Sequence, residues 1–206
     1  MVVPVFTDEE LEALRRFPDI GRDELFRFFT LTTADAAFVY PGRGRGPADR
    51  LGLAVTLCTL PWLGFVPDNV ASVPPASVIR LAEQLQVAPD AIRSYGRRAK
   101  TRTDHLRLVA QYLRWRPPTT IELKDLDEFL LARAVEHDSP TLLFRLACEY
   151  LISATVIRPG PVMVVKRVAP PGRSHGRRPS TGWHTSSPTS GASAWTTCWW
   201  WTQSSG

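Results

Sequence analysis

Residues 49–60 carry the sequence Asp-Arg-Leu-Gly-Leu-Ala-Val-Thr-Leu-Cys-Thr-Leu, which is apolar nearly all round a helical wheel. A helix of this kind has no polar face for water, so the stretch predicts a buried central helix surrounded by others. Strand-like alternation is scarce elsewhere, and the run from Val162 to Val165 is short. The sequence therefore predicts an all-α fold.

Helix signals lie on both sides of this segment. Thr7 and Glu10 have the spacing of a capping box, so a first helix begins after Thr7 and ends at Pro18. Proline and glycine predict loops at 41–47 and 61–75. We expect further helices at 22–29, from Thr32 or Thr33 to just before Pro41, and at about 75–86, 89–98, 103–113, 121–136 and 140–156.

Length and composition exclude several classes of protein. The 206 residues and 23.0 kDa suit one or two small domains, and 44% hydrophobic with 22% charged residues is typical of a globular chain. No apolar run is long enough to span a membrane, and the N-terminus lacks a secretory signal. Three widely spaced cysteines indicate neither a disulfide scaffold nor a zinc site. We therefore expect a cytoplasmic protein with no metal and no cofactor.

The last part of the chain differs sharply from the rest. Residues 169–206 contain no Leu, Ile, Val, Phe, Met, Asp or Glu, but five of the seven tryptophans. Such a segment cannot form a core, and we predict that it is disordered. With GC-rich codons read one nucleotide earlier, Trp183 to Trp201 becomes LAHLLTDERRERLDDLLVVD, which has leucines at helical spacing. We interpret the segment as a frameshifted continuation; the alternative is a genuine Trp-rich binding tail.

Residues 81–98, LAEQLQVAPDAIRSYGRR, resemble the helix-turn-helix pattern of bacterial and phage repressors. Gln86 stands where the pattern usually has glycine, which makes a left-handed turn costlier by about 1 kcal/mol. With Ile92 and Tyr95 packed inside, the predicted second helix leaves its polar residues on one exposed face. We expect Arg93, Ser94 and Arg97 on that face, with the two arginines one turn apart and pointing into a major groove. An ordinary helical hairpin is the alternative.

A strongly basic run overlaps this motif. Between residues 93 and 116 the only acid is Asp104. Arginine dominates, and its guanidinium group makes bidentate contacts with phosphate and guanine. The loop arginines Arg43 and Arg45 could add an arm for the minor groove, or be structural. The predicted DNA-binding residues are Arg93, Ser94, Arg97, Arg98, Lys100, Arg102, Arg107, Arg114, Arg116, Arg43 and Arg45.

Residues 5–168 resemble the N-terminal region of transposases of the Tn-three family, which serve class II replicative transposons. Two sites depart from the family pattern, Asp49 in place of Asn and Pro61 in place of Arg. The resemblance is carried by Glu24-Leu25, Phe29-Thr30-Leu31, Asp49 to Leu60, Leu63-Gly64, Pro67, Ala82 to Leu85, Tyr95, Arg97, Thr101 to Leu106 and Tyr112 to Arg116.

The resemblance implies a region that binds the terminal inverted repeats of a transposon as double-stranded DNA. It also implies that strand cleavage uses an Asp-Asp-Glu triad with two metal ions, far beyond the end of this chain. The dense acids here, Asp125, Asp127 and Glu128, lie on a helix filled with Leu and Phe, which indicates a solvated face. The four histidines are isolated and are expected at the surface or at helix caps. We therefore expect no enzyme activity and no small-molecule substrate.

We predict three segments, with a boundary at Pro117-Pro118. Residues 1–116 form a helical DNA-binding region with the helix-turn-helix at about 75–98. Residues 117–168 form a helical extension or a second small subdomain, and 169–206 form the disordered tail. We expect a bacterial, cytoplasmic protein that is associated with the nucleoid when it is bound to DNA. The alternative function is a helical protein-interaction module, whose surface would use Phe26, Phe28, Phe29 and Trp62.

Overall fold

The computed structural model describes residues 6–42, 44–137 and 139–168, and every regular element in these ranges is helical. The predicted all-α class is confirmed. The predicted tail, 169–206, lies outside the described residues. The elements are α1 (Asp8–Ala13), α2 (Arg22–Phe28), α3 (Thr33–Val39), α4 (Pro47–Leu63), the 3-10 helix η1 (Val70–Ser72), α5 (Pro75–Leu85), the 3-10 helix η2 (Pro89–Ser94), α6 (Ala99–Leu113), α7 (Thr120–Ala134), α8 (Pro140–Ser153) and α9 (Pro161–Val168).

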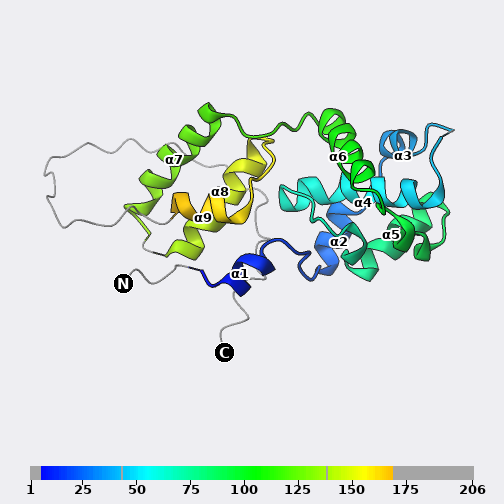
Figure 1. Cartoon of the computed structure of the whole chain (residues 1–206), viewed down its shortest axis with the longest axis horizontal. Helices are drawn as coiled ribbons and strands as arrows, with labels where there is room; N and C mark the ends of the chain where they lie inside the picture. The colour runs from blue at the N-terminus through cyan, green and yellow to red at the C-terminus, as the bar shows by residue number, and fades with distance from the viewer. Residues whose placement is uncertain (1–5, 43, 138, 169–206) are drawn as a thin grey trace, which may run out of the picture.

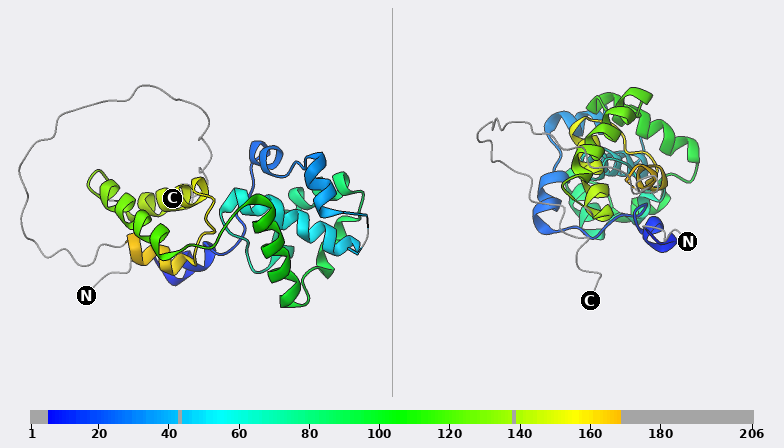
Figure 2. Two further views of the ribbon diagram at one scale, coloured as in Figure 1. Left: turned by 90° about the horizontal axis from the view of Figure 1, so that it is seen from above. Right: turned by 90° about the vertical axis from the view of Figure 1, so that its left-hand side faces the viewer.

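Helix α4 is the centre of the larger group of helices, with α2, α3, α5 and α6 arranged around it (Figures 1 and 2). All residues from Leu51 to Leu60 are buried, as the apolar sequence predicted. The helix also runs through Pro61, where a loop was predicted, and ends at Gly64 in the left-handed conformation. The last turn persists because Trp62 is buried with its ring 5.5 Å from that of Phe29.

One close approach decides how the chain packs on α4. A Cβ added at Gly52 would lie 2.1 Å from the ring of Tyr95, far inside van der Waals contact. Glycine at this position therefore lets the segment around η2 lie directly against α4. Tyr95 is buried there and starts the connection to α6.

A second hydrophobic cluster joins α7, α8 and α9 with Phe6 near the N-terminus. Thr7 forms the predicted capping box with Glu10 at the start of α1. The two clusters meet along a short backbone contact, in which Arg116 and Val156 form an isolated parallel bridge. The predicted division into domains at 116 and 117 stays a prediction.

Two predictions around the helix-turn-helix motif are wrong in detail. Residues 89–98 do not form one helix, because η2 ends at Ser94, Tyr95 is extended and Gly96 has φ +66°. In turn, α6 begins at Ala99 rather than 103. The turn before η2 does adopt the left-handed conformation at Gln86, with φ 52° and ψ 48°. Gly96 adopts a positive φ directly after Tyr95, whose buried ring packs against Gly52 of α4.

Candidate nucleic-acid interface

Helix α6 carries the polar surface of the basic region. Lys100, Thr103, Arg107 and Gln111 are exposed and follow one another at intervals of three or four residues, so they share one face. Val109 and Ala110 are buried against the core on the other side. Figure 1 shows α6 at the upper side of the group of helices around α4.

Five of the predicted DNA-binding residues are exposed cations whose side chains form no hydrogen bond or ion pair with any described residue. They lie on α6 and at its two ends. Arg97 and Arg98 precede the helix, and Arg114 follows it as a C-cap with φ 58°. The five are Arg97, Arg98, Lys100, Arg107 and Arg114.

Arg93 and Arg97 do not share a helix face, contrary to the prediction. Arg93 lies in η2 and forms an ion pair with Asp90 at 3.4 Å, both side chains being more than 80% exposed. Arg97 comes after the reversal at Gly96. Ser94 is exposed at the end of η2. An exposed pair of this kind contributes little to stability.

Two arginines of the basic run, Arg102 and Arg116, make side-chain contacts within the chain. Arg102 is half-buried and donates a hydrogen bond of 3.2 Å to the carbonyl of Gly96. Arg116 pairs with Glu122 and donates to the carbonyl of Ala154 at 3.2 Å. These two guanidinium groups are therefore used to hold the loop before α6 and the contact between the clusters.

The loop arginines divide in the same way. Arg45 folds back on α3 and donates hydrogen bonds of 2.6 and 3.1 Å to the carbonyls of Phe38 and Val39. Arg45 satisfies carbonyls at the end of that helix. It therefore has the structural role that was the alternative to a minor-groove arm. Arg43 lies outside the described residues.

The inner side of α6 is held by a buried polar pair that sequence reasoning missed. Tyr95 Oη lies 2.9 Å from Nδ1 of His105, and the two rings stack with centroids 5.5 Å apart. Burial raises the pKa of Tyr95, and burial lowers the pKa of His105. His105 is thus neither a surface nor a capping histidine. Its position four residues before Val109, on the apolar side of α6, was the available signal.

The C-terminal half of α6 is fixed to α3. The Tyr112 hydroxyl donates to Asp35 at 2.9 Å, and its ring stacks on Phe38 at 4.1 Å. Burial acts to raise the pKa of Asp35, but hydrogen bonds from Thr32 and Tyr112 outweigh it and lower the pKa overall. Side-chain contacts therefore hold α6 at His105 and at Tyr112 against the rest of the fold.

The acidic residues of α7 do not converge. Asp125, Asp127 and Glu128 are exposed, and Asp127 pairs with Arg167 of α9. In the part of the chain that the structure describes, no three His, Cys, Asp or Glu side chains are grouped as metal ligands. No helix among these residues has the length and hydropathy needed to cross a bilayer.

The aromatic residues proposed for a protein-interaction surface lie mostly in or near the hydrophobic core. Phe29 and Trp62 are buried, and Phe28 is half-buried. Phe26 is 50% exposed, with the guanidinium of Arg80 4.1 Å above its ring. These four residues therefore form no continuous apolar patch.

Comparison with known proteins agrees with the resemblance noted above. Residues 5–170 match the family model of a domain of unknown function, DUF4158. The chain is 36% identical over 166 residues to the transposase for transposon Tn2501 of Escherichia coli, which covers 79% of this chain and 16% of the relative. It is 30% identical over 156 residues to the transposase for transposon Tn21 of Escherichia coli, at 75% and 15% coverage. Against the transposase for transposon Tn501 of Pseudomonas aeruginosa it is 30% identical over 131 residues, at 64% and 13%. The chain spans no more than 16% of the length of these curated relatives.

Proposed function

The chain belongs to the DUF4158 family and is related to the N-terminal region of Tn-three family transposases, and from this premise we propose that it binds the terminal inverted repeats of a transposon. The observation that carries the proposal is the set of five exposed, unpaired cations on α6 and at its ends. Uncompensated arginine and lysine along one surface are the electrostatic footprint of a duplex-binding protein.

We assign groove insertion to α6 rather than to η2. A helix of 15 residues is about 22 Å long at 1.5 Å per residue, and the major groove of B-DNA is about 12 Å wide and admits a helix. The 3-10 helix η2 has only six residues and spans about 12 Å at about 2.0 Å per residue. On α6, the exposed side chains of Thr103, Arg107 and Gln111 supply donors and acceptors for base edges.

The remaining free cations flank this face. Arg97, Arg98 and Lys100 lie at the start of α6, and Arg114 lies just beyond its end. In the proposed complex they bind phosphates on either side of the groove and fix the register of the helix. The contacts of Tyr95 with His105 and of Tyr112 with Asp35 hold α6 in place while it does so.

We further infer that the chain takes no direct part in strand cleavage. Two-metal phosphoryl transfer needs carboxylates that converge on two ions about 4 Å apart. The acids of α7 face outward, and Asp127 is already paired with Arg167. The inferred role is to deliver a transposase to its DNA ends.

A protein-interaction module remains the second candidate, since α7 exposes apolar side chains. Ile121, Leu131 and Val135 are each more than 70% exposed at or just beyond this helix. A module of that kind would bind its partner without a steep dependence on salt, whereas DNA binding through α6 would weaken strongly as salt rises.

The test compares fluorescently labelled duplexes that carry the inverted repeat or a scrambled sequence of equal composition. Arg107→Ala and Gln111→Ala should each lose about 1–3 kcal/mol of preference for the repeat. Arg114→Ala is the matched control, which should weaken both duplexes equally. Equal affinity of the unaltered protein for both duplexes would contradict recognition of the repeat.

A further inference from the structure

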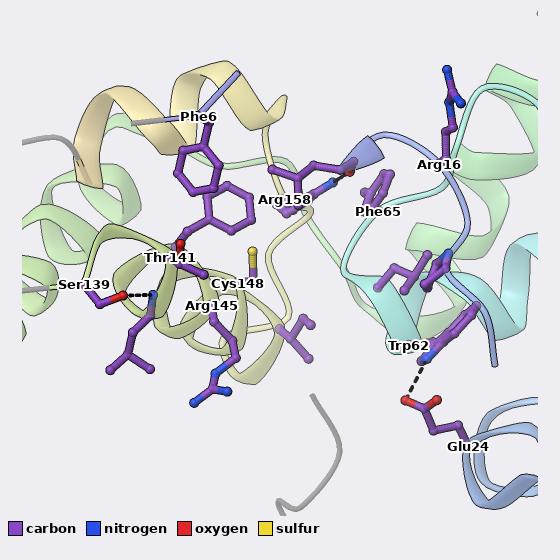
Figure 3. Close-up of a pocket in the computed structure, with 16 residues that line it drawn as sticks. Phe6, Arg16, Glu24, Trp62, Phe65, Ser139, Thr141, Arg145, Cys148 and Arg158 are labelled. Carbon is purple, nitrogen blue, oxygen red and sulfur yellow. Dashed lines mark hydrogen bonds between the residues drawn. The ribbon is translucent and has the colours of Figure 1, made fainter. Parts of the chain in front are cut away.

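A cavity of about 320 Å³ lies where the α4 group meets α8 (Figure 3). Its walls are largely apolar and come from distant parts of the sequence, because α4 and the residues after it face α8 and the N-terminal segment. Apolar wall residues include Phe6, Trp62, Phe65, Leu142, Phe144 and Ile152. Its volume lies within the range of small-molecule sites, which also combine apolar walls with a few polar groups.

The polar group inside this cavity is Arg158. Its side chain is buried, with 7% of the residue exposed, and its Cζ lies 3.8 Å from the ring centroid of Phe65. One nitrogen, Nη2, donates to the carbonyl of Leu14 at 2.7 Å, but the buried Nε has no partner. Among the described residues, no carboxylate forms an ion pair with Arg158.

A buried cation without an anion is costly, since desolvation is not repaid by a charge partner. Burial accordingly lowers the pKa of Arg158. Its neighbour Cys148 interacts with the guanidinium through its thiol, but burial raises the pKa of that thiol, which disfavours the thiolate. Among the residues that the structure describes, Arg158 therefore has no counter-ion, and it lines a largely apolar cavity.

The other charged residues of the wall have partners or are exposed. Arg16 pairs with Glu12 at 4.0 Å, and its side chain is 72% exposed. Glu24 accepts hydrogen bonds from Trp62 Nε1 at 3.4 Å and from the backbone of Gly21 at 3.2 Å, and Figure 3 shows it apart from Arg158, beyond Trp62. Arg145 is paired with Glu149 at 3.6 Å. Arg158 is thus the group through which a ligand would be recognised.

We propose that this cavity binds a small-molecule monocarboxylate with a compact apolar body. The carboxylate contacts Arg158, and the apolar body lies against Phe144, Leu142 and Ile152. Residues 169–206 contain no Asp or Glu, so the tail of the chain offers no acidic side chain for this position. Because both groups of helices supply the walls, the bound ligand stabilises their contact.

The experiment uses the 206-residue protein and three probes that share one apolar body: phenylbutanoate, phenylbutanol and phenylbutylamine. Binding is measured by titration calorimetry and by the shift in thermal unfolding. We expect phenylbutanoate to bind at least tenfold more tightly than the alcohol or the amine. Equal binding of acid and alcohol would show a merely apolar space, and no binding of any probe would show no site; either result overturns the proposal.

Variants of the wall residues test whether the probe binds in this cavity and contacts Arg158. Arg158→Met should abolish the preference for the acid over the alcohol, and Arg158→Lys should retain it. Arg145→Met, on the same wall, is the matched control and should change neither the affinity for the acid nor the affinity for the alcohol. Leu142→Trp should fill the cavity and weaken acid and alcohol together, which keeps the proposal testable if Arg158→Met does not fold.

Asp138 lies outside the described residues and is examined by Asp138→Asn. The proposal expects the affinity for phenylbutanoate to be unchanged. Binding that appears only in Asp138→Asn would show that Arg158 already has an anion, and would overturn it.

Discussion

The salt dependence of the proposed DNA binding tests how many cations contact phosphate. The structure predicts a smaller number than the count of basic residues in the sequence. Four free cations, Arg97, Arg98, Lys100 and Arg114, flank the proposed groove face. At about 0.9 per phosphate contact, they predict a slope of about −3.6 for log K against log salt. Raising the salt from 50 to 200 mM should then weaken binding about 150-fold. If all eight basic residues between 93 and 116 bound phosphate, the slope would be about −7.

Single charge removals check the assignment. Arg98→Gln and Arg114→Gln should each bring the slope about one unit closer to zero, on the repeat and on the scrambled duplex alike. Arg116→Gln is the matched control, since that guanidinium is bonded to Glu122 and Ala154 and should leave the slope unchanged. Anisotropy titrations at several salt concentrations measure all of them. A slope near −7, or an equal effect of Arg116→Gln, would refute the separation of free from engaged cations.

Three further predictions concern stability. Burial lowers the pKa of His105, so the unfolded chain takes up a proton more readily and stability should fall as the pH drops below about 6.5; His105→Gln should flatten that part of a urea-midpoint curve. Gly52→Ala should destabilise the protein by about 1–3 kcal/mol in urea unfolding, because the new Cβ would overlap the Tyr95 ring, whereas Gly160→Ala meets nothing within 4 Å and should be neutral. Removing residues 170–206, which lack Leu, Ile, Val, Phe and Met, should move the Tm by no more than about 2 °C in calorimetry.

Local signals in the sequence were sufficient to predict helix α1 and the central helix α4. The capping box of Thr7 and Glu10 and the apolar stretch 51–60 act through hydrogen bonds and side chains within one or two turns. The family resemblance was likewise legible, because it rests on the order of residues along the chain. For this reason the all-α class and the transposase relationship needed no coordinates.

The tertiary structure alone decided which charges remain free. The basic run looks uniform in sequence, but the Arg116 side chain donates to the carbonyl of Ala154, 38 positions away, while the Arg107 side chain has no hydrogen bond or ion pair with any described residue. Likewise, Tyr95 packs against Gly52, 43 positions away, and the single helix predicted over 89–98 is divided between η2, which ends at Ser94, and α6, which begins at Ala99. Distant segments brought together by folding determine the partners of a guanidinium, so its availability to DNA cannot be read from its neighbours in the chain.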